Sequence, residues 1–172
     1  MGFADYGVPD ATAVLWCHGG PGSRLEPAYL RRQASEAGLR IIGIDRPGYG
    51  LSAPQPGRAI AGWVPEALAV ADHLGIGQFA AVGTSTGGAF ALALAALPPE
   101  RVLGVVACCS MTDARWPQGR ATMSRPHVQA VWEGARPRGG PGGSDRGVRR
   151  GWQQDARRYS GSARSVRPGA VP

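Results

Sequence analysis

Short apolar runs recur along the first 110 residues and predict the strands of a buried sheet. The four clearest span residues 13–17, 39–44, 78–82 and 102–109. Each run is bounded by turn residues and has the length of a strand that is covered on both faces. The segment from Phe3 to Gly7 favours a further, short edge strand.

Segments with helical character separate these runs. Residues 28–37 and 63–74 are followed by Gly38 and Gly75, and the Ala- and Leu-rich segment beyond the third run stops at Pro98. Glycine just past a helix and proline at its end are ordinary stop signals. Strands that alternate with helices predict an α/β fold with a parallel sheet and right-handed crossovers.

The apolar pattern fades toward the carboxyl end. The last Ile, Phe and Leu are Ile76, Phe90 and Leu103, and the segment beyond cannot bury enough surface to offset its ordering entropy. We therefore expect three segments with different character. They are a partial sheet domain over 1–113, the start of a lid-like insertion over 114–135, and a low-complexity Arg/Gly/Pro-rich tail over 136–172 that is disordered or read out of frame.

Charge follows the same division. The chain has 172 residues, a formal net charge of +7 and 19 basic residues, all of them arginine. Residues 1–113 carry seven arginines against nine acidic residues, whereas residues 114–172 carry twelve against three. A GC-rich gene read out of frame gives such a tail, so we hypothesise a frameshift near Arg136. The alternative is a nucleic-acid-binding tail, which the lack of regular Arg-Gly-Gly repeats and interleaved aromatic residues disfavours.

Cysteines and the amino-terminal residues bear on the compartment. Cys17, Cys108 and Cys109 fall in expected strands, which favours buried, reduced thiols. No basic region followed by an apolar stretch marks a signal peptide, and no run reaches transmembrane length. We expect a cytoplasmic protein with no membrane partner.

The turn after the third run carries the strongest chemical signal. Ser85 lies between Gly83 and Gly87, where a strand gives way to a helix. A serine between two glycines at such a turn is the nucleophile-elbow pattern, in which the backbone at the serine is strained and a Cβ on either glycine would clash. The helix N-terminus places free N–H groups near a developing oxyanion. A coincidental turn is the alternative, since the chain has 27 glycines.

Two further loops complete a set of motifs. They run from His18 to Gly22 (HGGPG) and from Asp45 to Ser52 (DRPGYGLS), and both precede the Gly83–Gly88 turn. In this order the three motifs resemble the amino-terminal half of an α/β-hydrolase, and HGGPG is similar to the proline iminopeptidase branch and its esterase-like relatives. The resemblance covers about residues 1–135. It implies a partial α/β-hydrolase parallel sheet with flanking helices. It also implies that the protein hydrolyses a small-molecule ester or amide without a cofactor or metal.

The resemblance also implies roles for residues at the turn. Ser85 is the nucleophile, and the backbone N–H groups of Thr86 and Gly20 hold the oxyanion. His18 and Gly19 belong to the same oxyanion loop, where His18 shapes the loop rather than acting as a base.

A serine hydrolase also needs an acid and a histidine after the serine. The candidate acid is Asp113, with a surface-loop residue as the alternative, and the candidate base is His127, the only histidine beyond Ser85. No strand precedes His127, so the family's own acid and base would be missing from a chain truncated by the frameshift. A catalytically inactive remnant is then the alternative function. The unpaired edge of the last strand, residues 102–109, predicts self-association.

Overall fold

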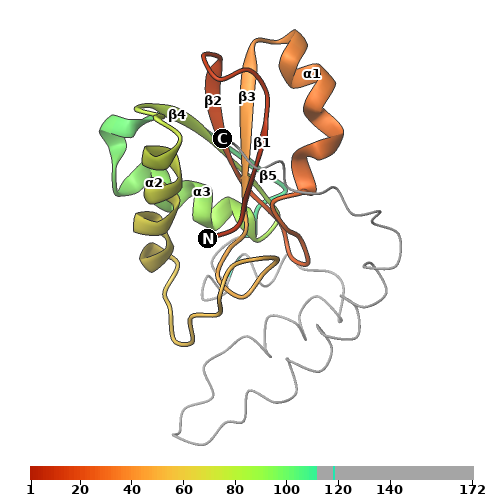
Figure 1. The fold of residues 1–172 in the computed structure, drawn as a ribbon. Coiled ribbons are helices and arrows are strands. Elements are labelled where there is room, and N and C mark those ends of the chain that lie inside the picture. The colour runs from red at the N-terminus through yellow and green to blue at the C-terminus, as the bar shows by residue number, and fades with distance from the viewer. Residues whose placement is uncertain (112–117, 119–172) are drawn as a thin grey trace, which may run out of the picture. The chain divides into compact units, whose positions relative to one another are not determined.

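The computed structural model describes residues 1–111 and Gln118. In this part of the chain five strands form one sheet, in the order β1-β3-β2-β4-β5 (Figure 1). β1 pairs antiparallel with β3, and the other neighbouring strands pair in parallel. The strands are β1 (Phe3–Tyr6), β2 (Thr12–Cys17), β3 (Leu39–Ile44), β4 (Phe79–Thr84) and β5 (Val102–Cys108). The expected α/β fold with a mainly parallel sheet is confirmed.

Three α-helices and three short 3₁₀ turns connect the strands. They are η1 (Glu26–Leu30), α1 (Arg31–Glu36), η2 (Ala61–Trp63), α2 (Val64–His73), α3 (Gly87–Ala96) and η3 (Pro99–Arg101). The expectation of one helix over 28–37 is wrong at its start, because the segment opens with a 3₁₀ turn, a common beginning for an α-helix. Within the described residues, no helix has the length and apolar character that crossing a bilayer requires.

The end of α2 shows how the sequence directs the chain into β4. Gly75 has a φ of +69°, a conformation that glycine adopts without a steric penalty. Its N–H donates to Asp72 O at 3.1 Å, and the N–H of Ile76 donates to Ala71 O at 2.8 Å. These two bonds form a Schellman motif, which ends the helix and turns the chain back toward the sheet.

Parallel pairing brings three loops to one edge of the sheet. Cys17, the last residue of β2, lies opposite Ile44 of β3 and Gly83 of β4. Thr84, the last residue of β4, lies opposite Cys108 of β5. The loops that follow β2, β3 and β4 therefore leave the sheet side by side, which places the three sequence motifs next to one another.

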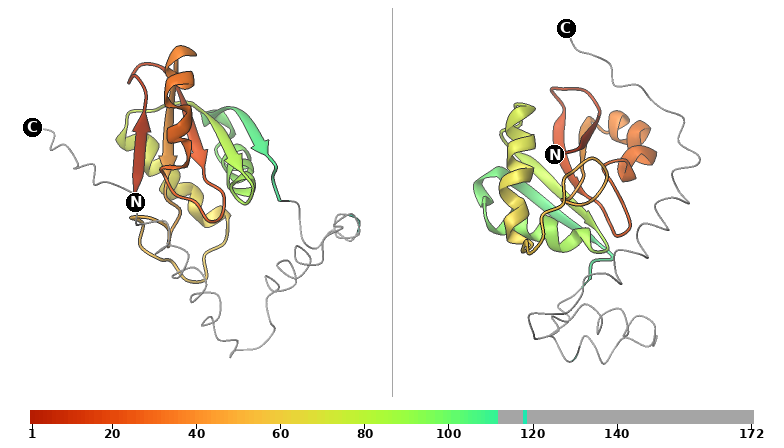
Figure 2. Two further views of the ribbon diagram at one scale, coloured as in Figure 1. Left: turned by 90° about the vertical axis from the view of Figure 1, so that its right-hand side faces the viewer. Right: turned by 60° about the horizontal axis from the view of Figure 1, so that its bottom comes forward.

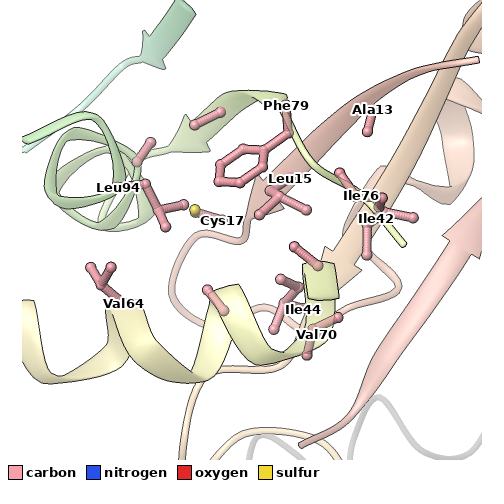
Figure 3. Close-up of a cluster of buried hydrophobic side chains, with 14 of the residues drawn as sticks. Ala13, Leu15, Cys17, Ile42, Ile44, Val64, Val70, Ile76, Phe79 and Leu94 are labelled. Carbon is pink, nitrogen blue, oxygen red and sulfur yellow. The ribbon is translucent and has the colours of Figure 1, made fainter. Parts of the chain in front are cut away.

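Helices cover both faces of the sheet, α2 and α3 on one face and α1 on the other (Figures 1 and 2). The larger apolar cluster lies under α2 and α3, where Leu15, Phe79 and Leu94 are fully buried (Figure 3). The smaller cluster lies under α1 and includes Val14 and Ala34. The neighbours Val14 and Leu15 belong to different clusters because successive strand residues point to opposite faces.

The expected burial of the cysteines holds for one residue of three. Cys17 is buried in the larger cluster, where burial raises the pKa of its thiol to about 12. Cys108 and Cys109 are exposed, so the prediction is wrong for both. They lie at the end of β5, one of the two edge strands of the sheet formed by the described residues, and Cys109 follows the strand with a φ of +48°. An apolar run alone does not distinguish an edge strand from a central one.

Apolar side chains also remain exposed along β5. Leu103 is 57% exposed and Val106 is 54% exposed. Within the described residues β5 pairs only with β4, so its second edge has no partner strand there. Self-association is expected through this edge of β5.

The two leucines of α3 test the assignment of the core. Replacing Leu94 with Ala removes a fully buried side chain, and we expect a loss of about 2–5 kcal/mol in the free energy of unfolding. Leu92 lies in the same helix and is 50% exposed, so Leu92→Ala is a matched control with an expected loss below about 0.5 kcal/mol. Urea unfolding followed by circular dichroism measures both, and equal losses would contradict the packing described here.

Candidate active site

The turn between β4 and α3 is tight and strained. Ser85 has a φ of +50°, which is uncommon for a residue with a side chain. A Cβ on Gly83 would overlap the carbonyl of Gly87, and a Cβ on Gly87 would overlap the carbonyl oxygen of Cys17. The turn therefore packs directly against the end of β2. Only glycine fits at positions 83 and 87, two residues before and two residues after the serine.

Backbone hydrogen bonds hold this turn from the side of β5. The N–H of Ser85 donates to Cys108 O at 2.9 Å, and the Ser85 carbonyl accepts from Gly88 N and Met111 N, each at 3.2 Å. The side chain of Ser85 is half-buried. Thr86 follows as the N-cap of α3, so its backbone lies at the amino-terminal end of the helix, where N–H groups have no partner within the helix.

The HGGPG loop lies directly beside the serine. A Cβ on Gly19 would be 3.5 Å from Ser85 Cβ, an ordinary packing distance. The N–H of Gly19 donates to Glu26 Oε2 at 2.9 Å and is therefore not free to bind an oxyanion. The role of the Gly20 N–H as the oxyanion donor of the loop stays a prediction. The peptide bond from Gly20 to Pro21 is cis.

Glu26 anchors this loop, and the sequence analysis did not single it out. Besides Gly19 N, its carboxylate accepts a hydrogen bond from Trp16 Nε1 at 3.0 Å and one from the Thr84 hydroxyl. One carboxylate thus ties the loop to both β2 and β4. In the sequence Glu26 has the pattern of an ordinary acidic residue at a helix start, and only the tertiary structure reveals its partners.

His18 is fully buried, and both of its ring nitrogens have partners. Its Nε2 accepts from the backbone N–H of Arg46 at 3.2 Å, so its Nδ1 carries the proton and donates to Gly19 O at 2.7 Å. Burial, reinforced by the charge of Arg46, lowers the pKa of His18 to about 4. A neutral ring with both nitrogens occupied holds the loop in place and is not available to take a proton from Ser85.

Arg46 is a second residue to which the sequence analysis gave no role. Its buried guanidinium donates from Nη2 to Gly19 O at 3.0 Å and to Thr86 Oγ1 at 3.4 Å. Its Cζ also lies 4.8 Å from the ring centroid of Tyr49 and 4.6 Å from that of Phe90. Burial lowers the pKa of this guanidinium from its usual value. A positive charge is thus buried immediately beneath the Ser85 turn.

The buried carboxylate of Asp45 joins the remaining loops. It accepts hydrogen bonds from Arg24 N at 2.7 Å, from Arg24 Nη1 at 2.8 Å and from Leu51 N at 2.8 Å. A Cβ on Gly50 would overlap this carboxylate, and Gly50 has a φ of +51°. The second motif therefore fixes loop structure around Asp45, whose carboxylate accepts three hydrogen bonds.

His73 lies far from the serine. It is exposed near the end of α2, and its ring packs edge-on against Phe3 with the centroids 6.0 Å apart. Both line a cavity of about 370 Å³ together with Val70. Phe3 belongs to β1, which is three strand positions from β4, or roughly 14 Å at the usual strand spacing.

Several expected features lie outside the described residues. These are Asp113, His127, the lid-like insertion over 114–135 and the tail over 136–172. Residues 1–111 contain no group of three or more His, Cys, Asp or Glu that could hold a metal ion.

The family model for the alpha/beta hydrolase fold matches residues 12–144. This match covers most of the chain, which therefore belongs to the alpha/beta hydrolase fold family. Proline iminopeptidase of Neisseria gonorrhoeae is 33% identical over 126 residues, which are 69% of this chain and 40% of that protein. A 2-hydroxymuconate semialdehyde hydrolase of Pseudomonas putida is 43% identical over 96 residues, 54% of this chain and 34% of that protein. The chain spans two fifths or less of the length of these relatives.

Solved structures agree with this assignment. A thermophilic esterase from Thermogutta terrifontis has a TM-score of 0.60 and 28% identity, over 70% of this chain and 44% of that one. A proline iminopeptidase-related protein from Thermus thermophilus has a TM-score of 0.57 over 65% of this chain and 41% of that one, and at 23% identity it supports the fold alone.

The buried His18 gives a testable dependence of stability on pH. Its pKa is near 4 when folded and near 6.5 when unfolded, so between these values the unfolded chain binds the extra proton. Its stabilising contribution is complete above pH 6.5 and declines as the pH falls toward 4, by up to about 3 kcal/mol. We expect His18→Gln to lose less stability than the wild type between pH 6.5 and 4.5. Urea unfolding at both pH values measures this, and equal losses in the two proteins would contradict it.

Proposed function

We propose that this chain is a serine hydrolase that acts on a small ester or amide, with Ser85 as the nucleophile. The observation that supports it most is the positive φ of Ser85 at the β4–α3 turn, with the HGGPG loop packed against the same side chain. Strain at a sharp strand-to-helix turn is how this fold lifts a nucleophile clear of the sheet. The relatives named above are a proline iminopeptidase, a 2-hydroxymuconate semialdehyde hydrolase and an esterase.

The chemistry follows from the groups around the turn. Ser85 Oγ bonds to the substrate carbonyl carbon, and the N–H groups of Thr86 and Gly20 bind the oxygen on which negative charge develops. The bond to the leaving group then breaks, and the leaving group takes up the proton that the serine lost. Water hydrolyses the acyl-enzyme and regenerates the serine. A base must carry these protons, because an un-ionised serine is a weak nucleophile.

Whether a histidine can act as the base for Ser85 decides between this proposal and the alternative of a catalytically inactive member of the family. The chain has three histidines. Both ring nitrogens of His18 are occupied. His73 packs against Phe3 of β1, a strand three positions from β4 in the sheet. A histidine-dependent mechanism therefore requires His127, with Asp113 as the candidate acid that orients it. If His127 does not serve Ser85, the chain retains the fold without turnover.

A serine-directed probe distinguishes these two functions. We expect the full chain to react with a fluorophosphonate and to hydrolyse 4-nitrophenyl acetate, and Ser85→Ala to reduce hydrolysis roughly a thousandfold or more. His127→Ala should cause a comparable loss, because serine and base act as a unit. Ser35→Ala removes an exposed serine of α1 and serves as the control. A wild-type chain that is folded yet neither labelled nor active would establish the inactive alternative.

We also propose self-association through the outer edge of β5. An edge strand with exposed apolar side chains is a template for pairing with another chain, and a charge on such a strand opposes that pairing. We expect Val106→Lys to shift the full chain toward monomer in sedimentation velocity experiments. Val8→Lys is the matched control, because Val8 is 56% exposed and Val106 is 54% exposed. A wild-type chain that is monomeric at every concentration would refute this proposal.

A further inference from the structure

Two arginines near the Ser85 turn lie against one aromatic ring without a carboxylate partner. The Cζ atoms of Arg46 and Arg58 are 4.6 Å and 5.7 Å from the ring centroid of Phe90. Burial lowers the pKa of Arg46, and the charge of Arg58 lowers it further. The ion pairs found among the described residues belong to other arginines, namely Arg24, Arg32, Arg40 and Arg101.

The second arginine has unused hydrogen-bond donors. Arg58 is half-buried, yet its Nε and Nη1 are inaccessible to solvent and have no hydrogen-bond partner. The same is true of Nε1 of Trp63, a residue that is fully buried. Leaving such donors buried and unpaired is unfavourable, and more so for a charged group. Three donors in this condition within six residues of sequence indicate a partner that is supplied from outside.

The two side chains that carry these donors pack around the same ring, that of Phe90. A Cβ on Gly62 would lie 3.3 Å from Arg58 Cγ, so the arginine stem packs across η2. Trp63, at the end of η2, packs edge-on against Phe90 with the centroids 5.5 Å apart and the planes at 87°. Arg58 and Trp63 therefore meet at the same ring, and their free donors belong to one small region of α3 and η2.

This region adjoins the Ser85 turn. Phe90 lies one helical turn after Thr86 on α3, so the two side chains share a helix face. Arg46 bridges them, because it donates to Thr86 Oγ1 while its guanidinium lies over Phe90. Glu66, three residues after Trp63, accepts a hydrogen bond from Gln55 through Oε1, whereas its Oε2 is buried without a hydrogen-bond partner. Glu66 forms no ion pair with Arg58 among the described residues.

We propose that Arg58 and Trp63 bind a carboxylate group of the substrate, with Arg46 adding positive potential. A guanidinium presents parallel N–H donors that match the two oxygens of a carboxylate, and such charge-assisted bonds are strong where water is excluded. The inference rests on the proposed function for its link to catalysis. It narrows the class of substrate to small esters or amides that carry a free carboxylate. Binding of this carboxylate holds the substrate in place while the reacting carbonyl lies at Ser85.

Binding can be tested without turnover. The full chain is titrated with succinate and, as an uncharged counterpart, with succinamide, and the indole N–H resonance of Trp63 is followed by NMR after assignment with Trp63→Phe. We expect succinate to shift this resonance and succinamide to leave it unchanged. We further expect Arg58→Gln to weaken succinate binding about tenfold or more. The matched control is Arg32→Gln, which removes the same charge from an exposed site on α1.

The outcomes separate this inference from the proposed function. Succinate binding that depends on Arg58 supports the inference even if Ser85 proves unreactive. Equal weakening by Arg58→Gln and Arg32→Gln would show that only the net positive charge attracts the anion, and would overturn the inference. Equal responses to succinate and succinamide would also overturn it, although hydrolysis that depends on Ser85 would still stand.

Discussion

The close approach of Gly87 to the carbonyl oxygen of Cys17 is the constraint on which the site depends. No side chain fits between the start of α3 and the end of β2, so the β4–α3 turn must lie directly on its neighbouring strand. At the same turn Ser85 has a φ of +50°, and a Cβ on Gly19 would lie 3.5 Å from the serine Cβ. A local choice of glycine thus determines a contact between segments almost seventy residues apart in the sequence.

Buried polar groups then hold the loops around this turn. Glu26 fixes the HGGPG loop to β2 and β4, while the ring of neutral His18 connects that loop to Arg46. Asp45 binds the backbone and side chain of Arg24. Buried polar groups need partners, since unpaired ones are costly, and the partners here come from strand ends and loops at the same edge of the sheet. The same reasoning makes the unpaired donors of Arg58 informative.

Much of the fold followed from local patterns in the sequence. The strands β2, β3, β4 and β5 stand where apolar runs placed them, and α2 ends at the glycine that its sequence offered. Errors arose where neighbours decide the outcome. Cys108 and Cys109 are exposed at the end of β5, an edge strand within the part of the chain that the structure describes. Burial at a sheet edge depends on what pairs beyond it rather than on the composition of the strand.

For the site, the sequence by itself determined the three motifs and the strands that each of them follows. Gly83 and Gly87 predicted the tight turn at Ser85, because the turn is possible only where these two residues lack a Cβ. The tertiary structure alone decided how the polar residues are used. It assigned Glu26 as an anchor, occupied both nitrogens of His18 and set Arg46 beneath Thr86. Such roles depend on which side chains meet in space across long sequence separations, and no local pattern records that.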